Sequence, residues 1–96
     1  RSLMRTIEYT GQFKRDYKRE TKSRHRQVLA DAVGAVVQDL ANDQPLQPRY
    51  RDHALTGNWS DHRDCHVKPD LVLIYRKVAD NRLQLVRLGS HAELSL

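Results

Sequence analysis

The feature that most constrains the fold is an apolar, β-branched stretch in the second half of the chain. Residues 71–78 form this stretch, interrupted only by Tyr75-Arg76-Lys77, as expected of a central strand. Residues 79–81 (Ala-Asp-Asn) read as a hairpin turn, and residues 82–88 alternate into a further strand. An earlier strand is predicted at residues 62–67, ending at the turn signal Lys68-Pro69-Asp70. Together these segments predict an antiparallel meander.

The first half of the chain has the spacing of helices. Within residues 12–21, Phe13 and Tyr17 lie four positions apart and basic residues occupy other faces. This pattern predicts an amphipathic helix with a basic exterior, opened by Thr10 and Gly11.

A second helix is predicted over residues 23–41, where apolar side chains recur at helical spacing. Gly34 weakens this helix by about 1 kcal/mol relative to alanine and would allow close packing. Residues 43–51 contain two prolines and are predicted to be a loop. Residues 55–59 are a weak strand candidate.

A short extended segment at residues 3–9 precedes the helices, so the element order is β-α-α-β-β-β. This order favours an α+β domain, an antiparallel sheet with two N-terminal helices packed on one face. Residues 89–96 are expected to add one helical turn. The chain has no internal repeat and no low-complexity segment.

The length of 96 residues predicts a single domain that spans residues 1–96. Residues 1–3 precede Met4, resemble an expression remnant and are left out of the functional argument. No apolar run long enough for a membrane span and no signal-peptide pattern is present. The single cysteine, Cys65, cannot form an intrachain disulfide, and a cytoplasmic protein is expected.

The balance of charge points to a polyanionic partner. Seventeen Lys and Arg residues against 12 Asp and Glu residues give a formal net charge of +5. Either nucleic acid or an acidic protein fits this excess. Charge alone does not decide between them.

Histidines are the main candidates for chemistry. Four of the five lie between His53 and His91, several of them close to acidic residues. Their spacing matches no metal-ligand pattern, so no metal and no cofactor is expected. Imidazoles beside carboxylates suit proton transfer, because they titrate near neutral pH. RNA cleavage through its 2′-hydroxyl needs only a base, an acid and cations to stabilise the phosphate. The candidate cations are Arg63, Lys68, Arg76 and Arg87.

Each of these residues also has a plain structural interpretation. His25 and His62 are expected to be surface residues, and Cys65 a small buried side chain. Trp59 is expected to anchor the core or an edge in preference to stacking on a base. In a regular strand over residues 62–67, Arg63 and His66 point to opposite faces, so one pocket would need a bulge to use both.

Four blocks of the sequence resemble the YafQ toxins of the RelE/ParE superfamily. They stand in the same order and at similar spacings across nearly the whole chain. They are residues 7–13 (Ile-Glu-Tyr-Thr-Gly-Gln-Phe), residues 50–59 with the form Asp-His-x-Leu-x-Gly-x-Trp, residues 63–75, and residues 87–92 (Arg-Leu-Gly-Ser-His-Ala).

The resemblance implies a RelE-like fold and a type II toxin that cleaves messenger RNA in the ribosomal A site and is neutralised by a cognate antitoxin. By matching position it implies the catalytic set His53, His66, Asp70 and His91. Asp70 or His66 is expected as the base, and His91 or His53 as the acid. The expected product is a 2′,3′-cyclic phosphate. The residues expected to contact RNA or its phosphate are Arg63, Arg87, Lys68 and Trp59.

One position departs from the family pattern. Ser95 stands where the family typically has an aromatic residue that holds the RNA base, and Trp59 or Tyr75 are the candidates to replace it. Two other functions remain open: a binding module on the same fold, such as a ParE-like gyrase inhibitor, and a ribonuclease that acts without ribosomes. The histidine set argues against the first, because ParE-like proteins generally lack it.

Overall fold

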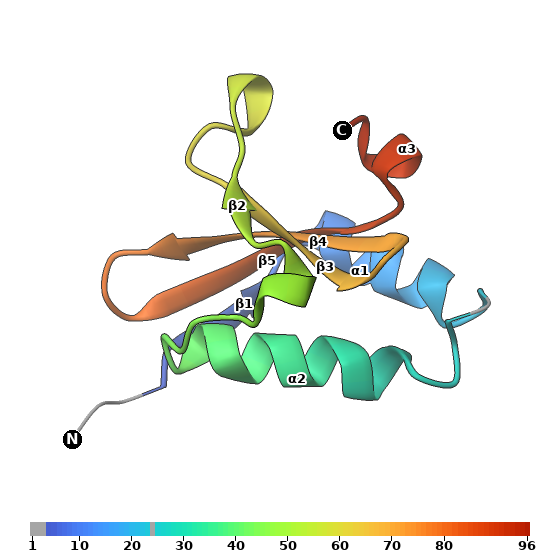
Figure 1. Cartoon of the computed structure of the whole chain (residues 1–96), viewed down its shortest axis with the longest axis horizontal. Coiled ribbons are helices and arrows are strands. Elements are labelled where there is room, and N and C mark those ends of the chain that lie inside the picture. Colours follow the sequence, from blue (N-terminus) through green and yellow to red (C-terminus); the bar gives the residue numbers. More distant parts are fainter. Residues whose placement is uncertain (1–3, 24) are drawn as a thin grey trace.

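A computed structural model describes residues 4–23 and 25–96 (Figure 1). The segment 1–3, interpreted above as a remnant, lies outside the described residues. A five-stranded sheet has the order β1-β5-β4-β3-β2. The elements are β1 (Thr6–Tyr9), α1 (Gly11–Glu20), α2 (Leu29–Ala41), the 3-10 turn η1 (Pro48–Tyr50), β2 (His53–Ala54), the 3-10 turn η2 (Gly57–Trp59), β3 (Arg63–Lys68), β4 (Leu71–Val78), β5 (Arg82–Gly89) and α3 (His91–Leu94).

The predicted meander is confirmed, since β3, β4 and β5 pair antiparallel in sequence order. The sheet as a whole is mixed, however, because β1 pairs parallel with β5, from Thr6 opposite Arg82 to Tyr9 opposite Leu85. A parallel neighbour requires a crossover connection, and here the helices and the other strands lie between the two. Nothing local in residues 6–9 could reveal a partner so far along the chain.

Helix α1 begins as expected. The Thr10 hydroxyl accepts a hydrogen bond from the Phe13 amide at 3.0 Å and donates one to the Val86 carbonyl at 2.8 Å. Thr10 therefore caps the helix and also extends the pairing along β5 beyond the end of β1.

Helix α2 begins at Leu29, six residues later than predicted. Residues 25–28 form turns, and the buried stripe of the helix starts only at Leu29. Helices gain most of their stability from tertiary packing of an apolar face, which residues 23–27 lack. A Cβ at Gly34 would meet nothing within 4 Å, so the expectation of close packing there was wrong.

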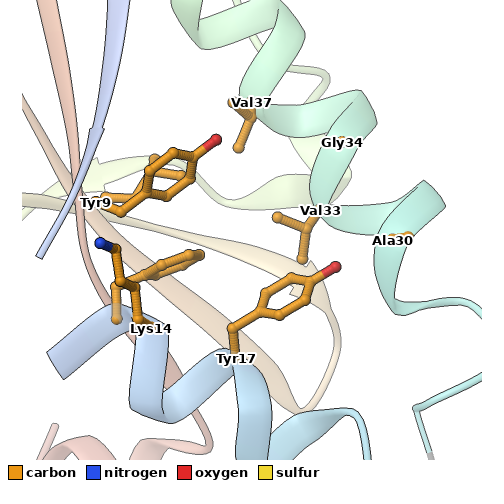
Figure 2. A pocket seen from close by; sticks show the side chains of 9 residues that line it. Tyr9, Lys14, Tyr17, Ala30, Val33, Gly34 and Val37 are labelled. Atoms are coloured by element: carbon orange, nitrogen blue, oxygen red, sulfur yellow. The ribbon is translucent and has the colours of Figure 1, made fainter. Parts of the chain in front are cut away.

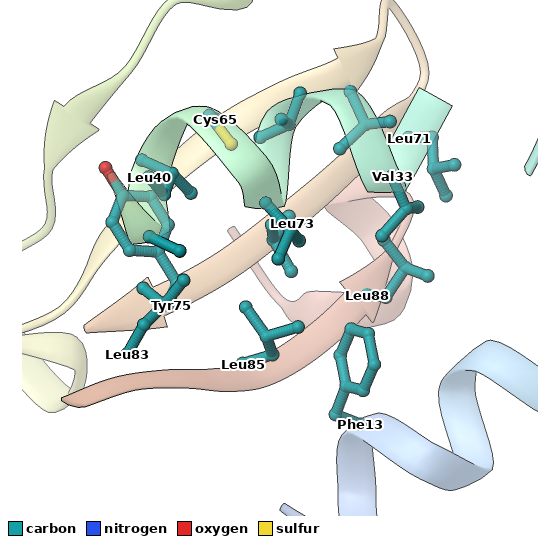
Figure 3. Close-up of a cluster of buried hydrophobic side chains, with 14 of the residues drawn as sticks. Phe13, Val33, Leu40, Cys65, Leu71, Leu73, Tyr75, Leu83, Leu85 and Leu88 are labelled. Atoms are coloured by element: carbon teal, nitrogen blue, oxygen red, sulfur yellow. The ribbon is translucent and has the colours of Figure 1, made fainter. Parts of the chain in front are cut away.

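Both helices pack on one face of the sheet, as predicted. The main core joins α1 and α2 to alternate residues of β4, namely Leu71, Leu73 and Tyr75 (Figure 3). The intervening residues Val72 and Ile74 are buried on the opposite face with Leu94 of α3. Strand β4 is thus covered on both faces, which explains its nearly continuous apolar sequence.

The weak strand expected at residues 55–59 is wrong. The short strand lies earlier, at His53–Ala54, and residues 57–59 form η2. Gly57 has a φ of 65°, a conformation that glycine adopts without strain and that interrupts a strand. The helical turn expected in the C-terminal tail is confirmed as α3. No helix within residues 4–23 and 25–96 has the length and apolar character to cross a membrane.

Candidate active site

A row of directly opposed residues crosses four strands on the sheet face away from α1 and α2. His53 of β2 pairs with Asp64 of β3, Asp64 with Ile74 of β4, and Ile74 with Arg87 of β5. Opposed residues in antiparallel strands project their side chains to the same face. Because Ile74 belongs to the cluster away from the two helices, the register places His53 and Asp64 on that face as well. Arg87 stands at the far end of the row, where its side chain binds Asp16 of α1.

The next row brings in two more histidines. His66 pairs with Val72, and Val72 pairs with Gly89. Gly89 is the last residue of β5, and α3 begins two residues later at His91. The ring centroids of His66 and His91 lie 4.9 Å apart, with 56° between the ring planes. Two predicted catalytic residues from distant parts of the sequence are thus in contact.

Helix α3 sets the position of His91. The Ser90 side chain accepts a hydrogen bond from the Glu93 amide, and the Glu93 carboxylate accepts one from the Ser90 amide, which together form a capping box. Leu94 packs on Val72 and Ile74. The cap and this apolar contact fix His91, the first residue of the helix, over the end of β5.

Asp64 stands at the centre of this cluster and was not selected from the sequence. Its side chain is 2% exposed. Burial raises the pKa of Asp64, and attraction to His53, His66 and His91 opposes that rise. The strand period was the available signal, because it places Asp64 on the same face as His66.

His53 approaches Asp64 through one ring nitrogen. Nδ1 lies 2.8 Å from the Arg51 carbonyl and 3.1 Å from Asp64 Oδ1. The contact between His53 Nδ1 and Asp64 Oδ1 is not an aligned hydrogen bond, because Oδ1 is buried and has no hydrogen-bond partner among the described residues. Both neighbours of Nδ1 are acceptors, so the neutral ring is assigned with its proton on Nδ1, which leaves Nε2 as the basic nitrogen.

Arg87 is held by helix α1. Its Nε and Nη2 donate to the Asp16 carboxylate at 2.7 and 3.2 Å. The Leu88 amide donates to Asp16 at 3.0 Å, and Arg19 donates to the Leu88 carbonyl at 2.8 Å. Burial on its own raises the pKa of Asp16, but the hydrogen bonds from Arg87 and Leu88 outweigh it and lower the pKa. Side chains of α1 therefore take the place of a neighbouring strand beside the end of β5.

Asp70 is placed differently from the three histidines. It lies in the β3–β4 turn, and its Oδ1 is 3.1 Å from His25 Nε2. His25 is only 15% exposed, so the expectation that it is a surface residue was wrong. The structure ties Asp70 to the segment before α2, whereas His53, His66 and His91 meet around Asp64.

Arg63 does not join the histidine cluster. Its Nε donates to Asp52 at 3.2 Å, and the Tyr75 hydroxyl donates to the same oxygen. Arg63 is paired with Tyr75, whose ring lies in the helix-side core, so Arg63 and His66 occupy opposite faces of β3. The fold therefore keeps Arg63 and His66 on opposite faces of the strand, as the sequence predicts for a regular strand.

The expected base-stacking residues are both engaged in packing. Tyr75 is buried, with its hydroxyl bound to Asp52, so it cannot replace an aromatic residue at Ser95. Trp59 packs against Val72 and Ile74, and its ring meets that of His62 edge-on at 5.3 Å. This arrangement is the anchoring role that was expected of Trp59.

An apolar groove of about 460 Å³ lies on the other side of the sheet, between α1 and α2 (Figure 2). Its walls include Tyr9, Tyr17, Val33 and Val37. Among the residues that the structure describes, the lining of this groove contains no histidine and no carboxylate. Among the residues that the structure describes, no three His, Cys, Asp or Glu side chains are arranged to hold a metal ion.

An α+β domain whose antiparallel meander carries two N-terminal helices on one face is the fold that the resemblance implies for RelE-like toxins. The family described as "Bacterial toxin of type II toxin-antitoxin system, YafQ" matches residues 5–96. The chain belongs to this family.

Individual relatives agree with this assignment. The protein named mRNA interferase toxin YafQ in Escherichia coli (strain K12) is 41% identical over 93 residues, which cover 96% of this chain and 97% of the relative. A metal-bound toxin from Helicobacter pylori superposes with a TM-score of 0.83 at 45% identity, over 96% of this chain and 99% of that one. YafQ in the E. coli DinJ-YafQ toxin-antitoxin complex superposes with a TM-score of 0.80 at 40% identity, over 96% and 98% of the two chains.

Proposed function

We propose that this chain is an endoribonuclease toxin that cleaves messenger RNA in the ribosomal A site and is neutralised by a cognate antitoxin. The observation that carries the proposal is the contact between His66 and His91 beside Asp64. The name mRNA interferase of the E. coli relative and its complex with DinJ support the same interpretation.

The chemistry assigned to the cluster is transfer within the RNA strand. A base removes the proton of a 2′-hydroxyl, and the resulting oxygen attacks the adjacent phosphorus. The bond from phosphorus to the 5′-oxygen breaks, and an acid protonates that oxygen. The products are a 2′,3′-cyclic phosphate and a free 5′-hydroxyl, so the reaction requires no added nucleophile.

We assign the base to His66 and the acid to His91, with Asp70 and His53 as the alternatives for the two roles. Adjacent imidazoles can serve one scissile phosphate from two sides. Asp64 is assigned as a positioning residue, whose carboxylate attracts His53, His66 and His91. Arg87 is assigned to stabilise charge on the phosphate through Nη1, which takes no part in its two bonds to Asp16.

The antitoxin is expected to be acidic in the segment that contacts this chain. The formal charge of +5 favours such a partner, and an acidic segment that folds on binding could cover the histidine face. Addition of the antitoxin at saturating concentration should abolish cleavage, and unchanged cleavage would refute this part of the proposal.

Translation-dependent cleavage of a defined messenger tests the proposal. The parent, His91→Ala and His66→Ala are compared, with His62→Ala as a control outside the cluster. We expect cuts at discrete codons only on ribosomes, a loss of about 100-fold or more in both variants, and activity in the control. Cleavage of naked RNA would favour a ribosome-independent nuclease. No cleavage, together with inhibited DNA supercoiling, would favour a gyrase inhibitor.

A further inference from the structure

A second depression, which we name the edge pocket, lies where β3 ends beside α2 and η1. Its volume is about 510 Å³. It is lined by Val28, Asp31, Ala32 and Ala35 before and within α2, by Arg49 and Tyr50 of η1, and by His66, Val67, Lys68 and Pro69 at the end of β3. His66 borders this pocket, while its ring contacts His91 on the face of the sheet away from α2, so the two sites meet around the edge formed by the end of β3.

At the end of β3 that borders the edge pocket, no strand pairs with its outer side among the described residues, and the turn η1 lies beside it. Strand β2 pairs with β3 at Arg63 and Asp64, and the segment from His66 to Lys68 lies beyond this pairing. The register against β4 shifts between His66 and Lys68, which marks a bulge. A bulge at a strand end turns side chains out of the regular pleat.

Arg49 and Tyr50 form one wall of the pocket, and Tyr50 also packs against the main core. The Arg49 guanidinium lies 4.8 Å from the centre of the Tyr50 ring, and Arg49 Nη2 donates to the Tyr50 hydroxyl at 2.8 Å. The two groups hold each other in place before any ligand arrives. Lys68 adds a second positive charge.

We propose that the edge pocket holds a nucleotide of single-stranded RNA next to the phosphate that is cleaved. Proteins bind single-stranded RNA with aromatic rings or guanidinium planes that stack on bases and with cations that follow the backbone, and Tyr50, Arg49 and Lys68 supply these groups. The inference rests on the proposed nuclease function and deepens it, because it makes this pocket a determinant of which sequence is cut.

Asp31 decides how the nucleotide would lie. A carboxylate repels phosphate but accepts hydrogen bonds from the amino group of a base. The base therefore faces Asp31 and stacks on the pair formed by Arg49 and Tyr50, and the phosphate lies toward Lys68 and His66. This orientation leads the RNA strand from the edge pocket toward the histidine cluster.

Tyr50→Leu and Tyr50→Phe provide the test, since leucine removes the stacking surface and phenylalanine keeps it. The concentration that gives half-maximal cleavage and the maximal rate are measured on programmed ribosomes, and cut sites are mapped on one messenger. We expect Tyr50→Leu to raise the half-maximal concentration about tenfold and to broaden the cut sites. Tyr50→Phe should stay within about twofold of the parent, because its π-face is retained.

Arg49→Gln is a second variant that tests the pocket without impairing folding, because Arg49 is exposed and contributes little to the core. We expect it to weaken cleavage severalfold with unchanged thermal unfolding. If the parent cleaves and folded Tyr50→Leu and Arg49→Gln match it in half-maximal concentration and cut sites, this inference falls while the nuclease function stands. If the parent does not cleave at all, the nuclease function fails and the inference falls with it. A loss of antitoxin affinity with cleavage unchanged would instead identify the pocket as a peptide site and overturn the proposal.

Discussion

Arg87 on the sheet and Asp16 on helix α1 are joined by two parallel hydrogen bonds, Nε to Oδ2 at 2.7 Å and Nη2 to Oδ1 at 3.2 Å. The Asp16 side chain is 1% exposed. The pair links the helix layer to the strand that leads into α3. Arg87, a candidate phosphate ligand, is thus oriented by a buried carboxylate on a different element.

Asp16→Ala should destabilise the fold strongly. The change leaves Arg87 and the Leu88 amide without their acceptor in a largely buried site, and breaking such a pair costs about 3–5 kcal/mol. Urea denaturation measures the loss. Asp43→Ala is the matched control, because Asp43 also binds two cations but is well exposed. The decrease in the free energy of unfolding should be much smaller in this variant. Equal losses in the two variants would contradict the role given to Asp16.

The contribution of Asp16 should depend on pH with a definite sign. The pKa of Asp16 is lowered in the folded state. The carboxylate therefore stabilises the folded state fully at pH values above the pKa of an aspartate in the unfolded chain, about 3.9. The stabilisation is lost as pH falls through the folded pKa. Parent and Asp16→Asn should therefore differ most in free energy of unfolding at neutral pH and converge at low pH. A difference that grows on acidification would show that the sign is wrong.

Asp64→Asn should separate stability from activity. Burial raises the pKa of Asp64, so the folded state favours the protonated carboxyl and loses stability as pH rises through the unfolded and folded pKa values. At neutral pH the amide should therefore leave the free energy of unfolding unchanged or increase it. Cleavage should fall about tenfold or more, because His53, His66 and His91 lose the carboxylate that they surround. Thermal melts and ribosome cleavage assays on the same samples measure both effects. A variant that is less stable at neutral pH and as active as the parent would contradict both expectations.

Gly89→Ala should disturb the placement of His91. A Cβ at Gly89 would lie 2.9 Å from Arg19 Nη2 and 3.0 Å from Glu93 Oε1. Arg19 is held by Leu88, so relief of the clash displaces either that contact or α3. We expect a loss of about 1–3 kcal/mol in unfolding free energy and a marked loss of cleavage.

Gly34→Ala is the control for Gly89→Ala, because a Cβ there meets nothing within 4 Å and the residue lies inside a helix. It should stabilise the protein by about 0.5–1 kcal/mol and leave cleavage unchanged. Similar effects from the two alanines would show that the space around Gly89 is not the cause.

Much of the candidate site could be predicted because it lies in short sequence blocks. His53, His66 and His91 were selected from the resemblance, and the fold brings them to one face of the sheet. Asp64 is not predicted as a site residue, because a carboxylate within a strand has the local pattern of a solvated residue and only tertiary neighbours bury it. Arg63 was selected although the strand period already placed it on the face opposite His66, where it binds Asp52.

The sequence by itself determined the elements in which buried side chains recur at regular intervals along a short segment. The boundaries of β4, the turn at residues 79–81, the capped start of α1 and the helical turn near the C-terminus all follow from neighbouring residues. Only the tertiary structure decided the parallel pairing of β1 with β5, the contact of His25 with Asp70 and the burial of Asp64. Those features join segments far apart in the chain. Their free energy comes from packing and electrostatics between elements, which no local pattern of residues encodes.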